Sequence, residues 1–335
     1  MMRSTLCVTL AAFLVSFAGC KHATPGRQRV HMVIAGSPSV ITYFPHVVAT
    51  QLDLYRKAGL NVEIESVNGG THGLQALIGG SCDVVLGFMD HPMRVASQGQ
   101  ELRAFVALTR YPGNVVIVSP AASKRIHRIE DLKGATVGVS DIGSQNHHFI
   151  NRVLVRNGLS TSEITPVAVG AHASALAALE RGKIDVWSGF DPAAAAFMNR
   201  FPNTTVLADT RTEQGLSAAL GTTEYPGSTL YSTQAWLMEH PEQAKEMAHA
   251  IVAALRWMQD HTPEELAAIV PADVKGQDSQ LYLQALKNNR AIYSTDGVIS
   301  AEGAQAVFDA LKSTAANSSQ YQFSPSRTYT NEFLR

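Results

Sequence analysis

The 335-residue sequence has no excess of charge of either sign and no long run of like charges. It carries 27 Lys and Arg against 28 Asp and Glu, a formal net charge of −1 with histidine neutral. A nucleic-acid-binding domain would present a basic face, so this balance excludes nucleic acid as an expected partner. It also leaves no electrostatic attraction to an anionic membrane surface.

Cysteine is scarce, with three in the whole chain. Cys7 and Cys20 fall in an N-terminal segment that we expect to be a targeting signal, which leaves Cys82 alone in the folded body. A single thiol excludes an intramolecular disulfide. At the start of an apolar strand, Cys82 is expected to be a small core residue.

Long apolar runs are also absent, apart from residues 6–17, which follow Arg3 and are too short to span a bilayer. This run ends in the sequence FAGC at 17–20, which resembles a bacterial lipobox except for Phe17. We predict a signal peptide over 1–19, lipidation at Cys20, and a lipidated cysteine and polar tether over 20–29. The lipid anchor would then be the only membrane attachment. The alternative is ordinary secretory cleavage near Gly19.

What is present is a repeat. The pattern G-x-x-D-V-x-x-G-F occurs at 80–88 and again at 182–190. An Ala-Leu pair precedes each copy, and an aspartate and a proline follow it closely. Two copies, each long enough to build a sheet, predict two similar α/β lobes that face each other across a binding cleft.

The mature body, 30–335, alternates short apolar runs with helical patterns, which is typical of mostly parallel sheets flanked by helices. From about residue 221 the pattern becomes helical, and we expect this block to return to lobe one. Lobe one is then 30–114 plus 226–335, and lobe two is 115–225. Two crossing segments near 114–120 and 221–229 would form the hinge.

The individual elements follow from period, caps and glycine stops. Strands are expected over 30–35, 62–67, 83–87, 103–108, 115–119, 135–139, 165–169, 185–188, 206–207 and 229–231. Helices are expected over 45–58, 73–78, 129–134, the segment from 144 to Gly158, 173–180, 233–240, 241–260, 263–270, 279–293 and 301–311. Residues 88–92 are expected to be a loop.

Several of these stretches together resemble one family. The run LKGATVGV at 132–139, the Gly-Ser pair at 143–144 and the second repeat copy resemble the substrate-binding proteins of ABC importers, in the nitrate/sulfonate/taurine class. The stretch YRKAGLNVE at 55–63 and HPE at 240–242 fit as well. The resemblance implies a two-lobed periplasmic-binding-protein fold of type II with a two-segment hinge. It also implies an ABC permease and its cytoplasmic ATPase as partners of a monomer, and that class includes binders of thiamine pyrimidine precursors.

In open α/β sheets the ligand lies beyond the carboxyl ends of the strands, which selects a few loops. Two of them, at 70–72 and 143–147, each open a helix with small residues, so exposed N–H groups and the helix dipole would attract an anion. The alternative is simple N-capping by Thr71, Ser144 or Asn146. These loops and those at 36–39 and 140–142 give the candidate ligand-binding residues Ser37, Ser39, Gly70, Thr71, His72, Ser140, Ser144, Gln145, Asn146 and His147.

Five more candidates stand apart from those loops. Asp90 and Asp191 follow matching strands and would pair with an amine at the cavity wall, or else form turns that bond their own backbone. Tyr43 and Phe44 would stack on a ring, or else pack as a hydrophobic staple. Asn114, at a crossing strand, would bond ligand from the hinge.

Six histidines lie in or beside cleft loops, at positions 46, 72, 91, 147, 148 and 172. No pair has the i, i+4 spacing of a helical metal site and carboxylate partners are few, so neither a metal nor another cofactor is predicted. One or two histidines donating to an anionic ligand is the better interpretation.

Three functions remain open. The first is an extracytoplasmic, lipid-anchored binding protein that captures a small organic anion, of sulfonate, taurine, nitrate or aromatic carboxylate type, or a pyrimidine-like heterocycle. The second is an enzyme on the same fold, for which no nucleophile–base pair or cofactor loop is evident. The third is a sensory module that presents ligand to a membrane receptor.

Overall fold

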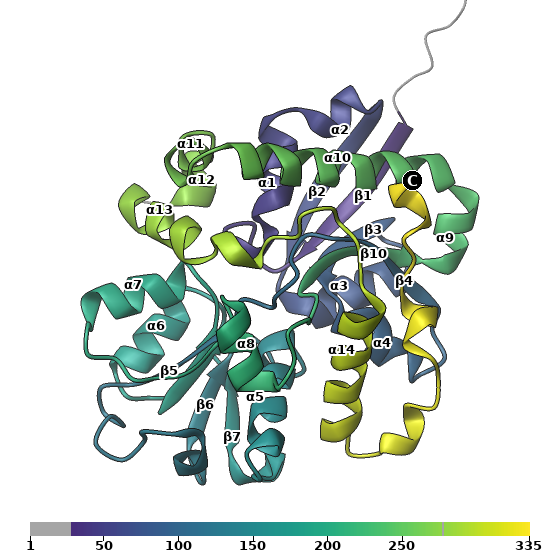
Figure 1. The fold of residues 1–335 in the computed structure, drawn as a ribbon. Helices are drawn as coiled ribbons and strands as arrows, with labels where there is room; N and C mark the ends of the chain where they lie inside the picture. The colour runs from purple at the N-terminus through teal and green to yellow at the C-terminus, as the bar shows by residue number, and fades with distance from the viewer. Residues whose placement is uncertain (1–27, 277) are drawn as a thin grey trace, which may run out of the picture.

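Two five-stranded mixed sheets frame the molecule, one in each lobe (Figure 1). The structure is a computed structural model that describes residues 28–276 and 278–335. The predicted signal peptide, Cys20 and most of the predicted tether therefore lie outside the described residues. The two-lobed α/β architecture expected from the repeat is confirmed.

The two sheets have the same topology. In lobe one the order is β2 (Leu60–Val67), β1 (Gln28–Ala35), β3 (Val84–Phe88), β10 (Ser228–Thr233) and β4 (Leu102–Ala107). In lobe two it is β7 (Thr165–Ala168), β6 (Thr136–Val139), β8 (Val186–Gly189), β5 (Val115–Val118) and β9 (Val206–Asp209). In each sheet the first three strands are parallel and the fourth runs antiparallel to both neighbours. Strand β10 thus brings the chain back to the first sheet.

The repeat builds the central strand of each sheet, β3 and β8, both buried along their whole length. Its aspartate lies just before the strand and locks it to the neighbouring parallel strand. The Asp83 carboxylate accepts a hydrogen bond from the His31 backbone N–H (2.7 Å), and Asp185 accepts one from the Thr136 N–H (2.9 Å). The shared aspartate is therefore a structural residue in both copies.

Helices cover both faces of each sheet. They are α1 (Phe44–Gln51), α2 (Leu54–Lys57), α3 (Gly69–Ile78), α4 (Asp90–Ala96), α5 (Gln145–Arg156), α6 (Ala173–Glu180), α7 (Ala193–Arg200) and α8 (Glu213–Leu220). The C-terminal block adds α9 (Gln234–Glu239), α10 (Pro241–Asp260), α11 (Pro263–Ala268), α12 (Ala272–Lys275), α13 (Ser279–Asn288) and α14 (Ala301–Thr314). No helix of the described ranges is long and apolar enough to cross a membrane.

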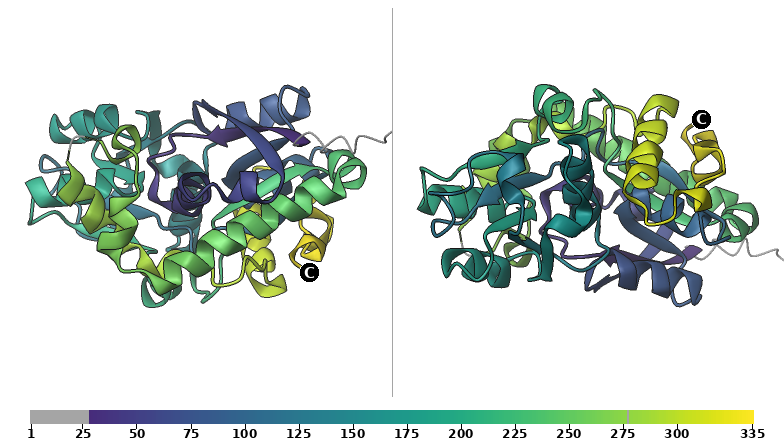
Figure 2. Two further views of the ribbon diagram at one scale, coloured as in Figure 1. Left: turned by 90° about the horizontal axis from the view of Figure 1, so that it is seen from above. Right: turned by 90° about the horizontal axis from the view of Figure 1, so that it is seen from below.

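The C-terminal block packs on more than lobe one. Helix α10 crosses over α1 of lobe one (Figure 2). However, α13 also contacts α7, and α14 lies between α4 of lobe one and α5 of lobe two. The block therefore bridges the lobes on one side of the cleft.

Several element predictions were wrong. The expected loop 88–92 contains the start of α4, because Asp and Pro suit the first turn of a helix as well as a turn. The expected helix 45–58 is split by Asp53, whose φ of 59° ends α1 and begins α2. Helices α7 and α8 were not predicted, and the helix from 279 ends at Asn288.

Candidate ligand-binding cleft

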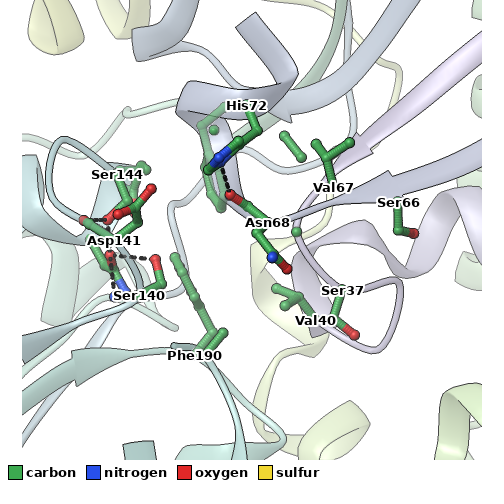
Figure 3. A pocket seen from close by; sticks show the side chains of 18 of the residues that line it. Ser37, Val40, Ser66, Val67, Asn68, His72, Ser140, Asp141, Ser144 and Phe190 are labelled. Carbon is green, nitrogen blue, oxygen red and sulfur yellow. Dashed lines mark hydrogen bonds between the residues drawn. The ribbon is translucent and has the colours of Figure 1, made fainter. Parts of the chain in front are cut away.

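A cavity of about 620 Å³ lies between the two lobes and is bordered by loops that follow β1, β2, β3, β6, β7 and β8 (Figure 3). These are the carboxyl ends of the parallel strands, where α/β proteins bind ligands. Its lobe-one wall is lined by Ala35, Gly36, Ser37, Pro38, Val40, Tyr43, Ser66, Val67, Asn68, Gly69, Gly70, His72, Phe88 and His91. Its lobe-two wall is lined by Ser140, Asp141, Ser144, Gln145, Asn146, Gly170, Ala171, His172 and Phe190.

Three helix N-termini face this cavity: α3 from lobe one, and α5 and α6 from lobe two. Their N-cap residues Asn68, Ser144 and His172 accept no hydrogen bond from the first turn of the helix. Five other helices are capped, by the side chains of Thr212, Thr233, Thr262, Asp278 and Ser300 at the start of α8, α9, α11, α13 and α14, whereas α1, α2, α4, α7, α10 and α12 also have no side-chain cap. The cleft helices thus keep first-turn N–H groups and dipole ends for a ligand.

Among the described residues that line the cavity, none is Lys or Arg, and the one carboxylate is that of Asp141. Two of the lining histidines are neutral at physiological pH. Burial lowers the pKa of His91 to about 3, and it also lowers the pKa of His172. Positive potential in the cavity therefore comes from helix ends and neutral donors rather than from fixed cations.

The floor of the cavity is aromatic. Phe88 and Phe190, the last residues of the two repeat copies, stack on each other across the lobes with ring centroids 5.4 Å apart and planes 19° apart. Tyr43 packs against Phe88 (5.8 Å) and donates its hydroxyl to the Ala35 carbonyl. With Val40 and Val67 these side chains give the cavity an apolar part of its lining.

The structure gathers part of the predicted set at the cavity. Ser37, Tyr43, Gly70, His72, Ser140, Ser144, Gln145 and Asn146 line it. Ser39, Phe44, Thr71, Asp90, Asn114, His147 and Asp191 do not. Phe44, next to Tyr43, is fully buried between Tyr282 and Tyr293 in the lobe-one core.

Some of these residues support the wall. Asn114 lies behind Gln145 and accepts a hydrogen bond from its side-chain amide (3.0 Å). The Asn146 side-chain carbonyl accepts from the Ser140 and Ser144 hydroxyls, so its oxygen is already occupied. His147 accepts from the Gly143 N–H through Nδ1 (2.9 Å), and Ser39 bonds the Ser37 hydroxyl.

The matched aspartates Asp90 and Asp191 are both buried, yet their surroundings differ. Asp191 accepts from Asn289 Nδ2 (2.6 Å), Arg211 Nη1 (3.0 Å) and the Ala195 N–H (2.8 Å), so it joins α7 to lobe one. Neither carboxylate oxygen of Asp90 has a hydrogen-bond partner in the part of the chain that the structure describes, and burial raises its pKa, although the charge of Arg94 opposes that.

Asn68, Phe88, His91, Asp141, His172 and Phe190 line the cavity and were not among the predicted residues. The repeat held a usable signal for two of them: a phenylalanine at the carboxyl end of matching central strands must reach the cleft in both lobes. Within the described ranges, no group of three or more His, Cys, Asp or Glu side chains is arranged to hold a metal ion.

Comparison with known proteins agrees with this geometry. The model of the family described as "NMT1/THI5 like" matches residues 41–265, two thirds of the chain. The chain belongs to the NMT1/THI5-like family. No curated protein matches it by sequence.

Solved structures share the two-lobed fold of this family member. A Bordetella bronchiseptica RB50 protein is 31% identical, with a TM-score of 0.86 over 92% of this chain and 96% of that one. The alkanesulfonate-binding protein SsuA of Xanthomonas axonopodis, solved with MOPS, is 21% identical with a TM-score of 0.65 over 91% and 96%. The nitrate-binding protein NrtA of Synechocystis is 12% identical with a TM-score of 0.67 over 91% and 87%. The periplasmic-binding-protein fold and the resemblance predicted from sequence are confirmed.

Proposed function

We propose that this family member is an extracytoplasmic solute-binding lipoprotein of an ABC importer, anchored at Cys20. It captures a small organic anion between its lobes and delivers it to a permease and, through it, a cytoplasmic ATPase. No chemical step is involved. The single observation that carries the ligand class is the convergence of three uncapped helix N-termini, from both lobes, on one cavity.

The size and floor of the cavity narrow the ligand further. At about 620 Å³ the cavity has the volume of sites for organic molecules, and nitrate would fill a small part of it. The stacked Phe88 and Phe190 and the neighbouring Tyr43 suit an alkyl chain or a ring. We therefore favour an alkyl or aryl sulfonate or carboxylate, consistent with the sulfonate and nitrate binders of the same fold.

Capture by a two-lobed protein needs a ligand that contacts both lobes, because only differential binding to the closed state shifts the population. Helix α3 contacts the cavity from lobe one, and helices α5 and α6 contact it from lobe two. One anion at their N-termini would therefore join the lobes, and closure would follow from binding.

A pyrimidine-like heterocycle is the second candidate, favoured by one observation. Asp141, at the lobe-two wall, is a carboxylate that would pair with a ring amine while the ring packs on the phenylalanines. The first candidate is an anion that accepts hydrogen bonds, and the second has a ring amine that donates them. Experiment can therefore separate the two.

The experiment is isothermal titration of purified protein with MOPS, hexanesulfonate, benzenesulfonate, benzoate, taurine, nitrate and 4-aminopyrimidine, followed by solution scattering with the tightest binder. We expect an organic sulfonate or carboxylate to bind and to compact the protein. Binding of 4-aminopyrimidine alone would replace the anion with the second candidate. Tight binding without compaction would contradict capture by closure.

The decisive variant is Asn68→Asp. Asn68 is exposed, lines the cavity and is the N-cap of α3, so the isosteric carboxylate would cap the helix and repel an anion. We expect at least tenfold weaker anion binding and unchanged or tighter binding of 4-aminopyrimidine, whose ring amine can donate to the new carboxylate. Asn317→Asp, at an exposed N-cap remote from the cavity, is the matched control and should leave the affinity unchanged.

A further inference from the structure

Helix α4 of lobe one sends one side chain across to the loop that begins α5 in lobe two. Arg94 Nη1 donates to the Gly143 carbonyl at 2.6 Å, and the Arg94 side chain is 20% exposed. Gly143 immediately precedes Ser144, Gln145 and Asn146, which line the cavity, whereas Arg94 does not. Arg94 therefore acts on the ligand wall through the loop rather than by contact with a ligand.

The loop is rigid enough to transmit that contact. The Gly143 N–H donates to His147 Nδ1 on the first turn of α5, and Ser144 donates its hydroxyl to the Asp141 carbonyl. Gly143 has a φ of 81°, and a Cβ at Gly143 would lie 3.5 Å from Arg94 Nη2. The position of Gly143 thus fixes the N-terminus of α5 relative to lobe one.

The same guanidinium has a second acceptor within reach. Asp90, one turn earlier on α4, has its Oδ2 4.0 Å from Arg94 Nη1, and both its oxygens lack a hydrogen-bond partner. His91 Nε2 lies 3.9 Å from Asp90 Oδ1, and His91 and His148 both have an unpartnered buried Nε2. A buried carboxylate without a hydrogen-bond donor costs free energy, so Asp90 would be stabilised by any donor that comes within reach.

We propose that Arg94 is a positioning residue of the cleft, which bonds the Gly143 carbonyl when the lobes are together and Asp90 when they part. The proposal rests on the proposed function, because it assumes that the lobes open and close around a ligand. Gly143 and His148 belong to lobe two and leave together on opening, while Asp90 and Arg94 remain on one helix. In both states the Arg94 guanidinium has a hydrogen-bond acceptor, so its pairing does not hold the protein in either the open or the closed state.

The two partners of Arg94 predict opposite variant effects. Arg94→Met removes the closed-state bond and should weaken binding of the tightest anion of the panel by about tenfold, through faster dissociation. Asp90→Asn removes the charge that draws Arg94 away and should slow dissociation by a few-fold. The double variant Asp90→Asn with Arg94→Met leaves no stranded buried charge, and it should release the anion as fast as Arg94→Met does.

Arg152→Met is the matched control. Arg152 of α5 also donates across the lobes, to the Ser313 hydroxyl at 3.0 Å, but it is remote from the loop at 140–144. We expect its dissociation rate within twofold of wild type. Equal effects of Arg94→Met and Arg152→Met would overturn the positioning role, and faster dissociation from Asp90→Asn would overturn the alternation.

A ligand-free readout separates this proposal from the proposed function. Spin labels on exposed Gln75 of α3 and Arg181 beyond α6 report the distance between the lobes. Without ligand, we expect Arg94→Met to lengthen the mean distance and Asp90→Asn to shorten it. If no anion of the panel binds but these shifts occur, the proposed function fails and the alternation stands; if an anion binds and neither shift occurs, the alternation fails.

Discussion

The two copies of the repeat are alike up to their phenylalanines and differ directly after them. Asp83 and Asp185 both accept the N–H of a neighbouring strand, and Phe88 and Phe190 meet in one stack. The next aspartates differ in their hydrogen bonds: among the described residues, three donors bond Asp191 and none bonds Asp90. The common segment builds the central strand of each lobe. The residues after it make different contacts between the lobes.

The difference lies in what surrounds each aspartate. Asp191 lies where lobe two meets the 3-10 turn η1 (Ile41–Tyr43) and the end of α13, and its backbone carbonyl also accepts the Ile41 N–H (3.2 Å). Asp90 lies on α4, 4.0 Å from Arg94, which bonds the loop that begins α5. One copy thus anchors lobe two to lobe one, while the other leaves a buried carboxyl group without a hydrogen bond among the described residues.

The largest expected effect is at the anchored copy. Asp191→Ala would remove a buried acceptor shared by Arg211, Asn289 and the Ala195 N–H, and because hydrogen bonds to a charged group contribute about 1.5–3 kcal/mol each, we expect a loss of about 3 kcal/mol. Urea unfolding should show that loss. Asp209→Ala is the control, because Asp209 pairs with the same Arg211 but is 36% exposed, so we expect about 1 kcal/mol or less. Equal losses would mean that burial does not set the difference.

The next largest effect on the free energy of unfolding is expected at Asp185, the aspartate of the second repeat copy. Burial raises its pKa, but hydrogen bonds from Arg125 and Thr136 outweigh burial and hold the pKa below its ordinary value. A depressed folded-state pKa contributes stability above the unfolded pKa, about 3.9, that is lost as the pH falls through the folded value. Asp185→Asn should therefore cost about 2 kcal/mol at pH 7.

The measurement is urea unfolding of wild type and Asp185→Asn between pH 7 and pH 3. The difference in unfolding free energy should shrink as the pH falls, because the wild-type carboxylate becomes protonated. A difference that is constant with pH would show that the Asp185 charge contributes nothing. Asp273 of α12, which is exposed, provides a control substitution to Asn, with a change smaller than that of Asp185→Asn.

Much of the architecture could be predicted from sequence because its signals are local. The repeat gave two lobes, and helix α10 was predicted with the bounds it has, from one apolar stripe behind Pro241. The cleft loops followed from the rule that ligands bind at the carboxyl ends of strands, and eight of the predicted residues line the cavity.

What could not be predicted depends on partners distant in the sequence. Tyr43 and Phe44 are adjacent, yet one lines the cavity and the other packs in the core, because the turn η1 (Ile41–Tyr43) separates their directions. Asp191 is bonded by Asn289, 98 residues away, and no local pattern predicts that partner.

The contribution of Asp90 to the free energy of unfolding should change with pH in the opposite sense to that of Asp185. Burial raises the pKa of Asp90, so the folded state binds a proton more tightly than the unfolded one and loses stability as the pH rises above about 3.9 toward the folded value. Asp90→Asn should therefore stabilise the protein by about 1 kcal/mol at pH 7. The gain should vanish below pH 3.9 in urea unfolding, and a loss of stability at pH 7 would show that the carboxylate is satisfied.

The smallest effect tests whether the two copies cooperate through their phenylalanines. A double-mutant cycle of Phe88→Leu and Phe190→Leu should give a coupling free energy of about 0.5–1.5 kcal/mol, the range for aromatic pairs. The control is the cycle of Phe197 and Phe201, whose rings lie 4.8 Å apart at the end of α7 within lobe two. Both cycles are measured by urea unfolding, with and without the tightest anion of the panel.

The ligand dependence of that coupling is the informative quantity. Phe197 and Phe201 stay together however the lobes move, so their coupling should be the same with and without anion. Phe88 and Phe190 touch only when the lobes are together, so their coupling should fall toward zero in a ligand-free protein that spends most of its time open. The difference between the two conditions then measures what the stack contributes to closure. A coupling that is equal in both conditions would show that the cleft is already closed before any ligand arrives.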